Sequence, residues 1–166
     1  MDNWLTATRG RLASAGFVLH DDVSFEGRTF QLVGRQTRFE LTKCGFSESF
    51  FIFGEFDRLA NEALRQFSAA AFRFAKERRV IPLPCGLFES VWCYAVAISK
   101  AVDEQTLTSV RFETPPKHWA AFEMPIVYDE TEGRLYYFEK TPIWGAAYYR
   151  GFRKKIRQLL GESGPA

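Results

Sequence analysis

Residues 123–160 constrain the fold most, because they change from the two-residue period of a strand to the period of a helix. Residues 126–128 and 135–140 are short runs rich in aromatic and β-branched side chains. A polar turn containing Gly133 joins them, and this pattern predicts a β-hairpin. Pro125 cannot donate a hydrogen bond to a neighbouring strand, so we expect the first strand to begin there or to lie at a sheet edge.

A basic amphipathic helix follows this hairpin. Its apolar stripe comprises Tyr149, Phe152, Ile156 and Leu159, and its cations fall largely off that stripe. Gly161 comes directly after the last apolar residue, which is typical of the end of a helix. We therefore expect the helix to pack on a sheet and residues 162–166 to form a frayed tail.

The preceding residues predict two more helices and five more strands. The first helix covers residues 3–15 and ends at Gly16, and the second covers residues 58–79 with Asp57 as its N-cap. The expected strands are 29–33, 37–43, 50–53, 91–98 and 107–113, with a turn at 34–36 between the first two. The run at 50–53 is continuously apolar, which is typical of a strand covered on both faces.

These elements predict a single α+β domain over residues 1–166. Its expected order is α-βββ-α-ββββ-α, with three helices on one face of a single-layer sheet of about six to seven strands. We expect mainly antiparallel pairing, because the connections between neighbouring strands look short. The order of elements is similar to that of small α+β secretion chaperones, which form dimers and bind partner chains. That fold-level likeness implies only that such a layout can act without catalysis.

Composition excludes several classes of protein. Apolar residues make up 46% and charged residues 25% of the chain, as in ordinary globular domains. The net charge of +2 is too small to imply a polyanionic partner by itself. Cys44, Cys85 and Cys93 are an odd number without metal or redox spacing, which favours a reducing compartment. The start is polar and no apolar run is long enough to cross a membrane, so we expect a cytoplasmic protein.

No motif in the sequence predicts a catalytic, metal or cofactor site. The two histidines lack zinc spacing, and the acidic turn with Asp129, Glu130 and Glu132 lacks the pattern of a calcium loop. Nucleotide-binding loops and the serine elbow are also missing. Cys85 and His118 could form a nucleophilic pair only if the fold joined them, and free cysteines are more often small buried residues.

Acidic residues raise two further possibilities. Asp129, Glu139 and Lys140 partly match the acidic pattern of metal-dependent nucleases, but adjacent residues of a strand point to opposite faces, so Glu139 and Lys140 cannot act together. Glu89 and Glu123 lie among apolar residues, and burial would raise their pKa values, a mark of functional sites. An arginine partner or a strand-end position is the simpler interpretation.

The aromatic content of 16% is the unusual feature of the composition. It indicates either a phenylalanine-rich core or a surface for a partner or an apolar ligand. Our leading hypothesis is a non-enzymatic binding or protein-interaction module that self-associates, as a homodimer, through an aromatic surface. The candidate interface residues are Trp144, Tyr148, Tyr149 and Phe152.

Two alternatives remain open. The basic C-terminal helix could bind nucleic acid through Arg150, Arg153, Lys154 and Arg157, with an affinity that falls steeply with salt. The simpler interpretation of these cations is a solvated face that complements the helix dipole. The other alternative is an enzyme with a hidden aromatic-lined pocket, which predicts a deep cleft with two or more converging polar groups.

Overall fold

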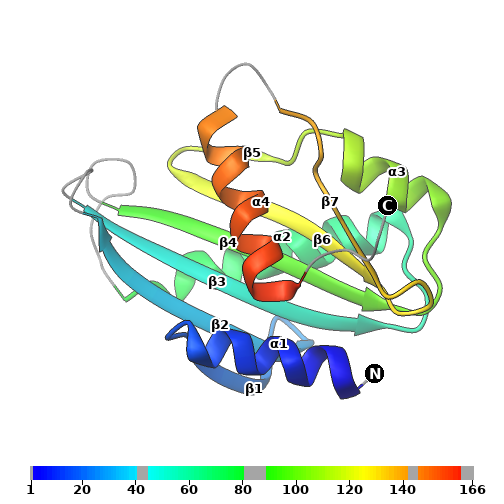
Figure 1. Ribbon diagram of the computed structural model, residues 1–166, viewed down its shortest axis with the longest axis horizontal. Helices are drawn as coiled ribbons and strands as arrows, with labels where there is room; N and C mark the ends of the chain where they lie inside the picture. The colour runs from blue at the N-terminus through cyan, green and yellow to red at the C-terminus, as the bar shows by residue number, and fades with distance from the viewer. Residues whose placement is uncertain (1, 41–44, 81–88, 142–145, 162–166) are drawn as a thin grey trace.

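Four helices and seven strands make up the part of the chain that the computed structural model describes, residues 2–40, 45–80, 89–141 and 146–161 (Figure 1). The helices are α1 (Asp2–Ser14), α2 (Asn61–Glu77), α3 (Glu104–Phe112) and α4 (Ala146–Leu160). The strands are β1 (Val18–Phe25), β2 (Arg28–Glu40), β3 (Gly45–Phe56), β4 (Glu89–Ser99), β5 (Lys117–His118), β6 (Ala121–Asp129) and β7 (Arg134–Tyr137). Within these ranges no helix is long and apolar enough to span a membrane. The tail at 162–166 lies outside the described residues.

The strands form one mixed sheet in the order β1-β2-β3-β4-β6-β5, and β7 pairs with β6 beyond the end of β5. The first three strands are antiparallel, whereas β3, β4 and β6 run parallel to one another. Parallel neighbours need long crossover connections, and α2 and α3 supply them. The α+β class is confirmed. The expectation of mainly antiparallel pairing is wrong because the helix predicted at 58–79 and the unpredicted helix α3 are both crossovers between parallel strands.

Two elements differ from the prediction for local reasons. Residues 107–113 were expected to be a strand, but most of them belong to α3, which brings the number of helices to four. Thr106, Ser109 and Val110 are the buried residues of this helix, a helical spacing that a short window does not reveal. The expected turn at 34–36 lies inside the continuous strand β2, where a side chain on Gly34 would come within 3.2 Å of Leu19.

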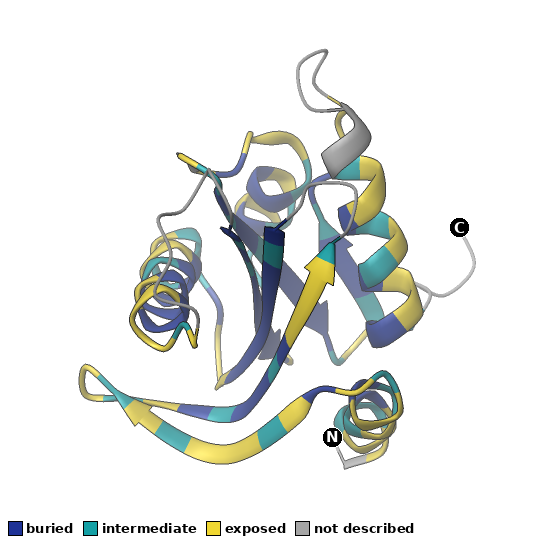
Figure 2. Ribbon diagram, turned by 90° about the vertical axis from the view of Figure 1, so that its left-hand side faces the viewer, coloured by how far each residue is buried: buried dark blue, intermediate teal, exposed yellow. Residues whose placement is uncertain are grey.

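Helices cover both faces of the sheet, and not one face as predicted (Figure 2). One core lies under α2 and α3 and includes Phe50 and Ile52, and the other lies under α1 and α4 and includes Phe51 and Phe53. The prediction that residues 50–53 form a strand covered on both faces is therefore confirmed. Residues 91–98 likewise lie in a buried central strand, β4.

The helix limits follow partly from the predicted signals. Gly16, two residues beyond α1, and Gly161, directly beyond α4, adopt positive φ angles of 84° and 99°, as the sequence predicts for helix ends. Asp57 is not the N-cap of α2, because the helix begins later and Ala60 takes that position. The stripe predicted for this helix, which runs through Leu64, Phe67, Ala71 and Phe74, is buried.

Pro125 lies within β6, which begins at Ala121 and has neighbours on both sides, so the expected strand start is wrong. On its outer side, however, β6 pairs with β5 through Ala121 and Phe122 and with β7 only from Ile126 onwards. Residues 123–125 therefore have no strand partner on that side. A proline, which cannot donate to a ladder, is tolerated in such a gap.

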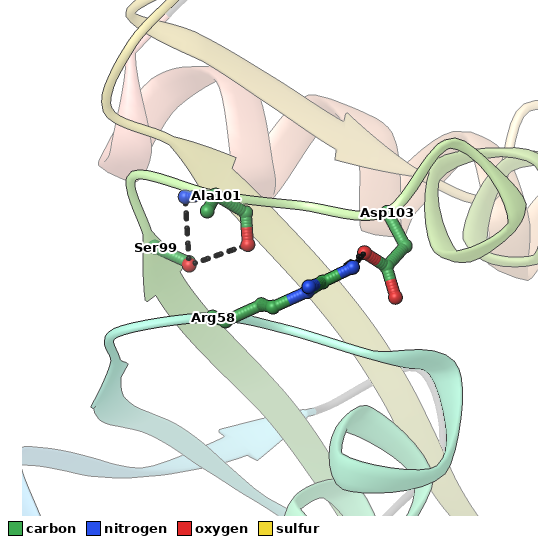
Figure 3. Close-up of polar contacts among 4 residues, drawn as sticks. All are labelled: Arg58, Ser99, Ala101 and Asp103. Atoms are coloured by element: carbon green, nitrogen blue, oxygen red, sulfur yellow. Dashed lines mark hydrogen bonds and ion pairs between the residues drawn. The ribbon is translucent and has the colours of Figure 1, made fainter.

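The two crossovers are tied together at the carboxyl ends of β3 and β4 (Figure 3). The N–H of Leu59 donates to the carbonyl of Ala101 at 2.8 Å. Arg58 forms an ion pair with Asp103 at 2.8 Å, so the Asp103 carboxylate binds this arginine and does not cap α3. This link fixes the starts of α2 and α3 relative to each other.

Candidate functional site

A pocket of about 440 Å³ opens between α2, α3 and the gap along the outer side of β6. Its apolar lining includes Leu64 from α2, Val110 from α3 and Pro125 from β6. Ser68 and Glu123 are polar residues of the same lining. Small-molecule sites are commonly 300–1,000 Å³ in volume, mostly apolar, and contain a few placed polar groups. The pocket has the size and character of such a site.

Glu123 is the buried anion of this pocket, with a residue exposure of 6%. The Ser68 hydroxyl donates to its Oε1 at 2.6 Å, and Nε2 of His118 lies 3.0 Å from its Oε2. A carboxylate can accept about four hydrogen bonds, so acceptor capacity remains after these two contacts. The arrangement fixes the orientation of the carboxylate and leaves it able to receive a donor from a ligand.

The fold brings Glu123, Ser68 and His118 together from three separate elements, β6, α2 and β5. Glu123 lies on the face of β6 that α2 covers, and it is paired in register with Cys93 on β4. Burial raises the pKa of the Cys93 thiol well above its usual value, and the charge of Glu123 adds to the effect. Cys93 is therefore held as a neutral thiol and is not an activated nucleophile.

His118 is fixed by its ring as well as by its hydrogen bond. The imidazole stacks on Phe72 of α2 with ring centroids 4.0 Å apart, and one ring nitrogen contacts Glu123. Its Nδ1 makes no hydrogen bond within the described part of the chain. Ser68 donates to Glu123 and not to His118, so the three residues do not form a serine–histidine–acid triad.

An exposed ion pair crosses the pocket between α2 and α3. Arg65 Nη2 and Glu113 Oε2 are 2.8 Å apart, and the two side chains are 60% and 59% exposed. Exposed ion pairs contribute about 0–1 kcal/mol. The pair can therefore separate at little cost when a molecule enters.

The sequence identified part of this site. Glu123 was suspected because it is an acid among apolar residues. His118 was considered as a zinc ligand and as a partner of Cys85, which lies outside the described residues. Ser68 was missed, although it falls on the buried face of α2 beside Phe67. A polar residue on a buried helix face is a signal that a hydrogen-bond partner must face it.

Glu89 belongs to a different cluster, at the amino-terminal ends of β3 and β4. Its Oε2 lies 3.0 Å from Nη1 of Arg79, so the arginine partner that we expected for it is confirmed. Burial raises the pKa of Glu89, and the neighbouring carboxyl of Glu48 adds to that rise. Glu48 also accepts a hydrogen bond from the backbone N–H of Val80 at 2.9 Å. Both acids are almost fully buried, so this cluster offers little surface to a ligand.

The predicted aromatic interface residues lie mainly inside the molecule where the structure describes them. Phe152 is 1% exposed and contacts the rings of Trp92 and Tyr94. Tyr149 is half-buried against Phe138. Trp144 and the side chain of Tyr148 lie outside the described residues. Phe152 is therefore part of the core between α4 and the sheet.

The predicted basic residues divide into two groups. Arg153 donates to the carbonyls of Glu139 and Lys140 at 2.9 and 3.2 Å, so it fastens the segment after β7. Arg150, Lys154 and Arg157 are exposed at helical spacing on one face of α4, and α4 contains no acidic residue. Of the four cations predicted to bind nucleic acid, only these three are therefore available to an anionic partner.

The acids considered for metal or nuclease chemistry have structural contacts. Asp129 accepts hydrogen bonds from the backbone N–H groups of Thr131 and Glu132 in the turn between β6 and β7. Glu139 forms an ion pair with Arg111 at 2.7 Å. Within the described ranges, no group of three or more metal-ligating side chains comes together.

No protein-family model, curated protein or solved structure matches this chain.

Proposed function

We propose that this chain is a binding domain that holds a small molecule in the pocket between α2 and α3. The observation that carries the proposal is the buried Glu123 carboxylate, oriented by Ser68 and His118 in an otherwise mainly apolar pocket. Binding is favoured over turnover because the Ser68 hydroxyl is engaged by Glu123 and the Cys93 thiol is neutral. The proposal combines the binding-module hypothesis with the converging polar groups expected of a hidden pocket.

The pocket's chemistry favours a ligand with an apolar body and a nitrogen that donates hydrogen bonds. Arg65 pairs with Glu113, whereas Glu123 has no lysine or arginine partner within the described residues and contacts only Ser68 and His118. An ammonium or amide group can use the remaining acceptor capacity of this carboxylate. Hydrogen bonds to charged groups stabilise by about 1.5–3 kcal/mol, which gives a strong preference for such a donor over a carboxylate ligand.

The test compares hexylamine, hexanol and hexanoate, which share an apolar chain and differ in the head group. We expect hexylamine to bind most tightly, with amide chemical shifts changing at Ser68 and Ser109 in NMR titrations. The variant Glu123→Gln keeps the shape of the side chain and removes its charge, and it should weaken hexylamine binding about tenfold or more. Its effect on hexanol should be much smaller.

Glu104→Gln is the matched control, because Glu104 is an exposed acid in the first turn of α3 and does not line the pocket. It should leave all three affinities unchanged. Equal binding of hexanoate and hexylamine, or an unaltered hexylamine affinity in Glu123→Gln, would show that the carboxylate does not recognise the ligand.

Polyanion binding by α4 is the second candidate function. Its support is the exposed stripe of Arg150, Lys154 and Arg157 on a helix without acidic residues. Three phosphate contacts would give a slope of about −2.7 for the logarithm of affinity against the logarithm of salt concentration on duplex DNA. Arg153 is excluded from this surface by its carbonyl contacts.

Charge reversal tests this second function. The double variant Arg150→Glu/Lys154→Glu should weaken binding to a 20-base-pair duplex about tenfold or more and flatten the salt dependence. Lys100→Glu changes an exposed lysine outside α4 and is the control. An unchanged affinity in the double variant, measured by fluorescence anisotropy, would remove α4 as a nucleic-acid surface.

Self-association and a cytoplasmic location stay predictions from the sequence. If the chain does self-associate, Phe152 is buried within one copy and cannot supply the contact. Trp119, which is 84% exposed in the turn between β5 and β6, is the most exposed large apolar residue in the described part of the chain.

A further inference from the structure

The open stretch of β6 at residues 123–125 borders the pocket between α2 and α3. On the outer side of β6, β5 pairs with Ala121 and Phe122, and β7 pairs from Ile126 onwards. Glu123 and Pro125, which lie between these two partners, belong to the pocket lining. The pocket therefore adjoins strand backbone that has no neighbouring strand on this side.

The pairing of β6 with β4 shows which backbone groups face this gap. The N–H of Val91 on β4 donates to the carbonyl of Ala120 at 3.2 Å, and Glu130, at the other end of β6, donates its N–H to β4 at 2.9 Å. Alternate residues of a strand form their hydrogen bonds on opposite sides, so the even-numbered residues of β6 bond to β4. The N–H and C=O of Glu123 and the C=O of Pro125 therefore point into the gap.

These backbone groups can accept a partner from outside the chain. Glu123 is nearly buried, and its N–H and C=O form no hydrogen bond on the outer side of β6 within the described ranges. Buried backbone donors and acceptors nearly always have a partner, either in the protein or in a bound molecule. Pro125 has no N–H, so the gap offers one donor and two acceptors to a molecule in the pocket.

We propose that the ligand of this pocket is a short peptide with a free amino terminus, an inference that rests on the amine-binding function proposed above. The α-ammonium group of the peptide donates to the Glu123 carboxylate. Its first peptide groups pair with the backbone of residues 123–125, as an extended peptide does at the open edge of a sheet. One molecule thus uses both the buried charge and the open backbone.

The site limits this peptide to a few residues with an apolar first side chain. The gap is three residues long, and β5 and β7 close it at its two ends. Leu64 and Val110 in the pocket lining can contact an apolar side chain. A carboxyl terminus is disfavoured in the same place, because it would bring a second anion next to Glu123.

The experiment compares four ligands by isothermal titration calorimetry. They are leucyl-alanine amide, its N-acetyl derivative, the ester analogue leucyl-lactamide and 3-methylbutylamine, which has the same side chain and ammonium group without a peptide group. We expect leucyl-alanine amide to bind about tenfold or more tightly than 3-methylbutylamine, because it gains hydrogen bonds to the backbone. Acetylation should weaken its binding about tenfold or more, and the ester, which lacks the peptide N–H, should bind about fivefold more weakly.

Nuclear magnetic resonance locates the peptide in the gap. The amide proton of Glu123 should move downfield when leucyl-alanine amide binds, because its N–H then acquires an acceptor. 3-Methylbutylamine, which has no carbonyl group, should not cause this shift. The amide proton of Met124, an even-numbered residue that bonds to β4 in either case, is the internal control.

The outcomes separate this inference from the function on which it rests. If hexylamine binds through Glu123 but leucyl-alanine amide binds no more tightly than 3-methylbutylamine, the pocket is an amine site and the peptide proposal is wrong. Equal affinities of the acetylated and free peptides would also overturn it, because the amino terminus would then not be recognised. If neither hexylamine nor leucyl-alanine amide binds, the proposed function and this inference both fail.

Discussion

Replacing Phe152 by alanine is expected to lower the free energy of unfolding by about 3–5 kcal/mol. The ring is 1% exposed and lies within 4.7 Å of Trp92 and 5.5 Å of Tyr94 and Phe122, measured between centroids. Its removal leaves a cavity between α4 and the sheet that neighbouring rings cannot fill without leaving their present contacts. Urea denaturation followed by circular dichroism measures the loss.

The same variant distinguishes a core role from an interface role for Phe152. Arg150→Ala, on the exposed side of the same helix, should change the free energy of unfolding by no more than about 0.5 kcal/mol. A Phe152→Ala protein that unfolds like the wild type but differs from it in mass by light scattering would contradict the packing described above. It would instead support the interface that the sequence suggested.

Replacing Gly54 by alanine is expected to destabilise the chain by about 1–3 kcal/mol, although only one methyl group is added. A side chain at this position of β3 would come within 2.6 Å of a ring atom of Phe67, which is buried at 2% exposure under α2. Either the ring or the whole of α2 must move to admit it. Thermal unfolding monitored by circular dichroism would show a lower midpoint.

Gly10→Ala is the matched control for this second prediction. Gly10 lies in α1 with no atom within 4 Å of the added methyl, and alanine favours a helix over glycine by up to about 1 kcal/mol. This variant should therefore be more stable than the wild type. In the double variant Gly54→Ala/Phe67→Leu the two costs should not add, because the smaller side chain relieves the contact. If the two losses of unfolding free energy add strictly, the strain caused by the alanine does not come from its contact with Phe67.

The sequence located the central strands because their composition leaves few choices. Residues 50–53 and 91–98 are almost continuously apolar, which suits a buried strand or a buried helix, and the β-branched and aromatic content of 91–98 favours a strand. The helices with clear apolar stripes were predicted for the same reason. Their existence depends on local pattern, which a sequence displays directly.

Strand direction and the identity of α3 depend on contacts between distant residues. The parallel pairing of β3 with β4 follows from where α2 packs, and no short window contains that information. Residues 107–113 alternate in the manner of a strand and were predicted as one, whereas most of them belong to the helix that crosses from β4 to β6. The sequence therefore predicts the elements better than their arrangement.

The candidate pocket shows the same division. An acid among apolar residues marked Glu123, but its two partners lie on α2 and β5, 55 and 5 positions away in the chain. Only the folded sheet brings Ser68 and His118 to opposite oxygens of one carboxylate. A sequence can indicate which charged residue is buried, whereas the hydrogen-bond partners that compensate for its burial are visible only in the structure.

On its outer side β6 pairs with two short strands, β5 and β7, and this division limits how another chain could add a strand to the sheet. A foreign strand needs a long, flat row of free backbone donors and acceptors to extend a sheet. At this border the outermost place in the sheet is divided between β5, which has two residues, and β7, which has four residues. On the opposite border, Asp22 of β1 has a φ of 49° and is missing from the ladder with β2. Within the described residues, neither of these borders offers a long uninterrupted template, a feature that disfavours strand-by-strand, fibrous aggregation.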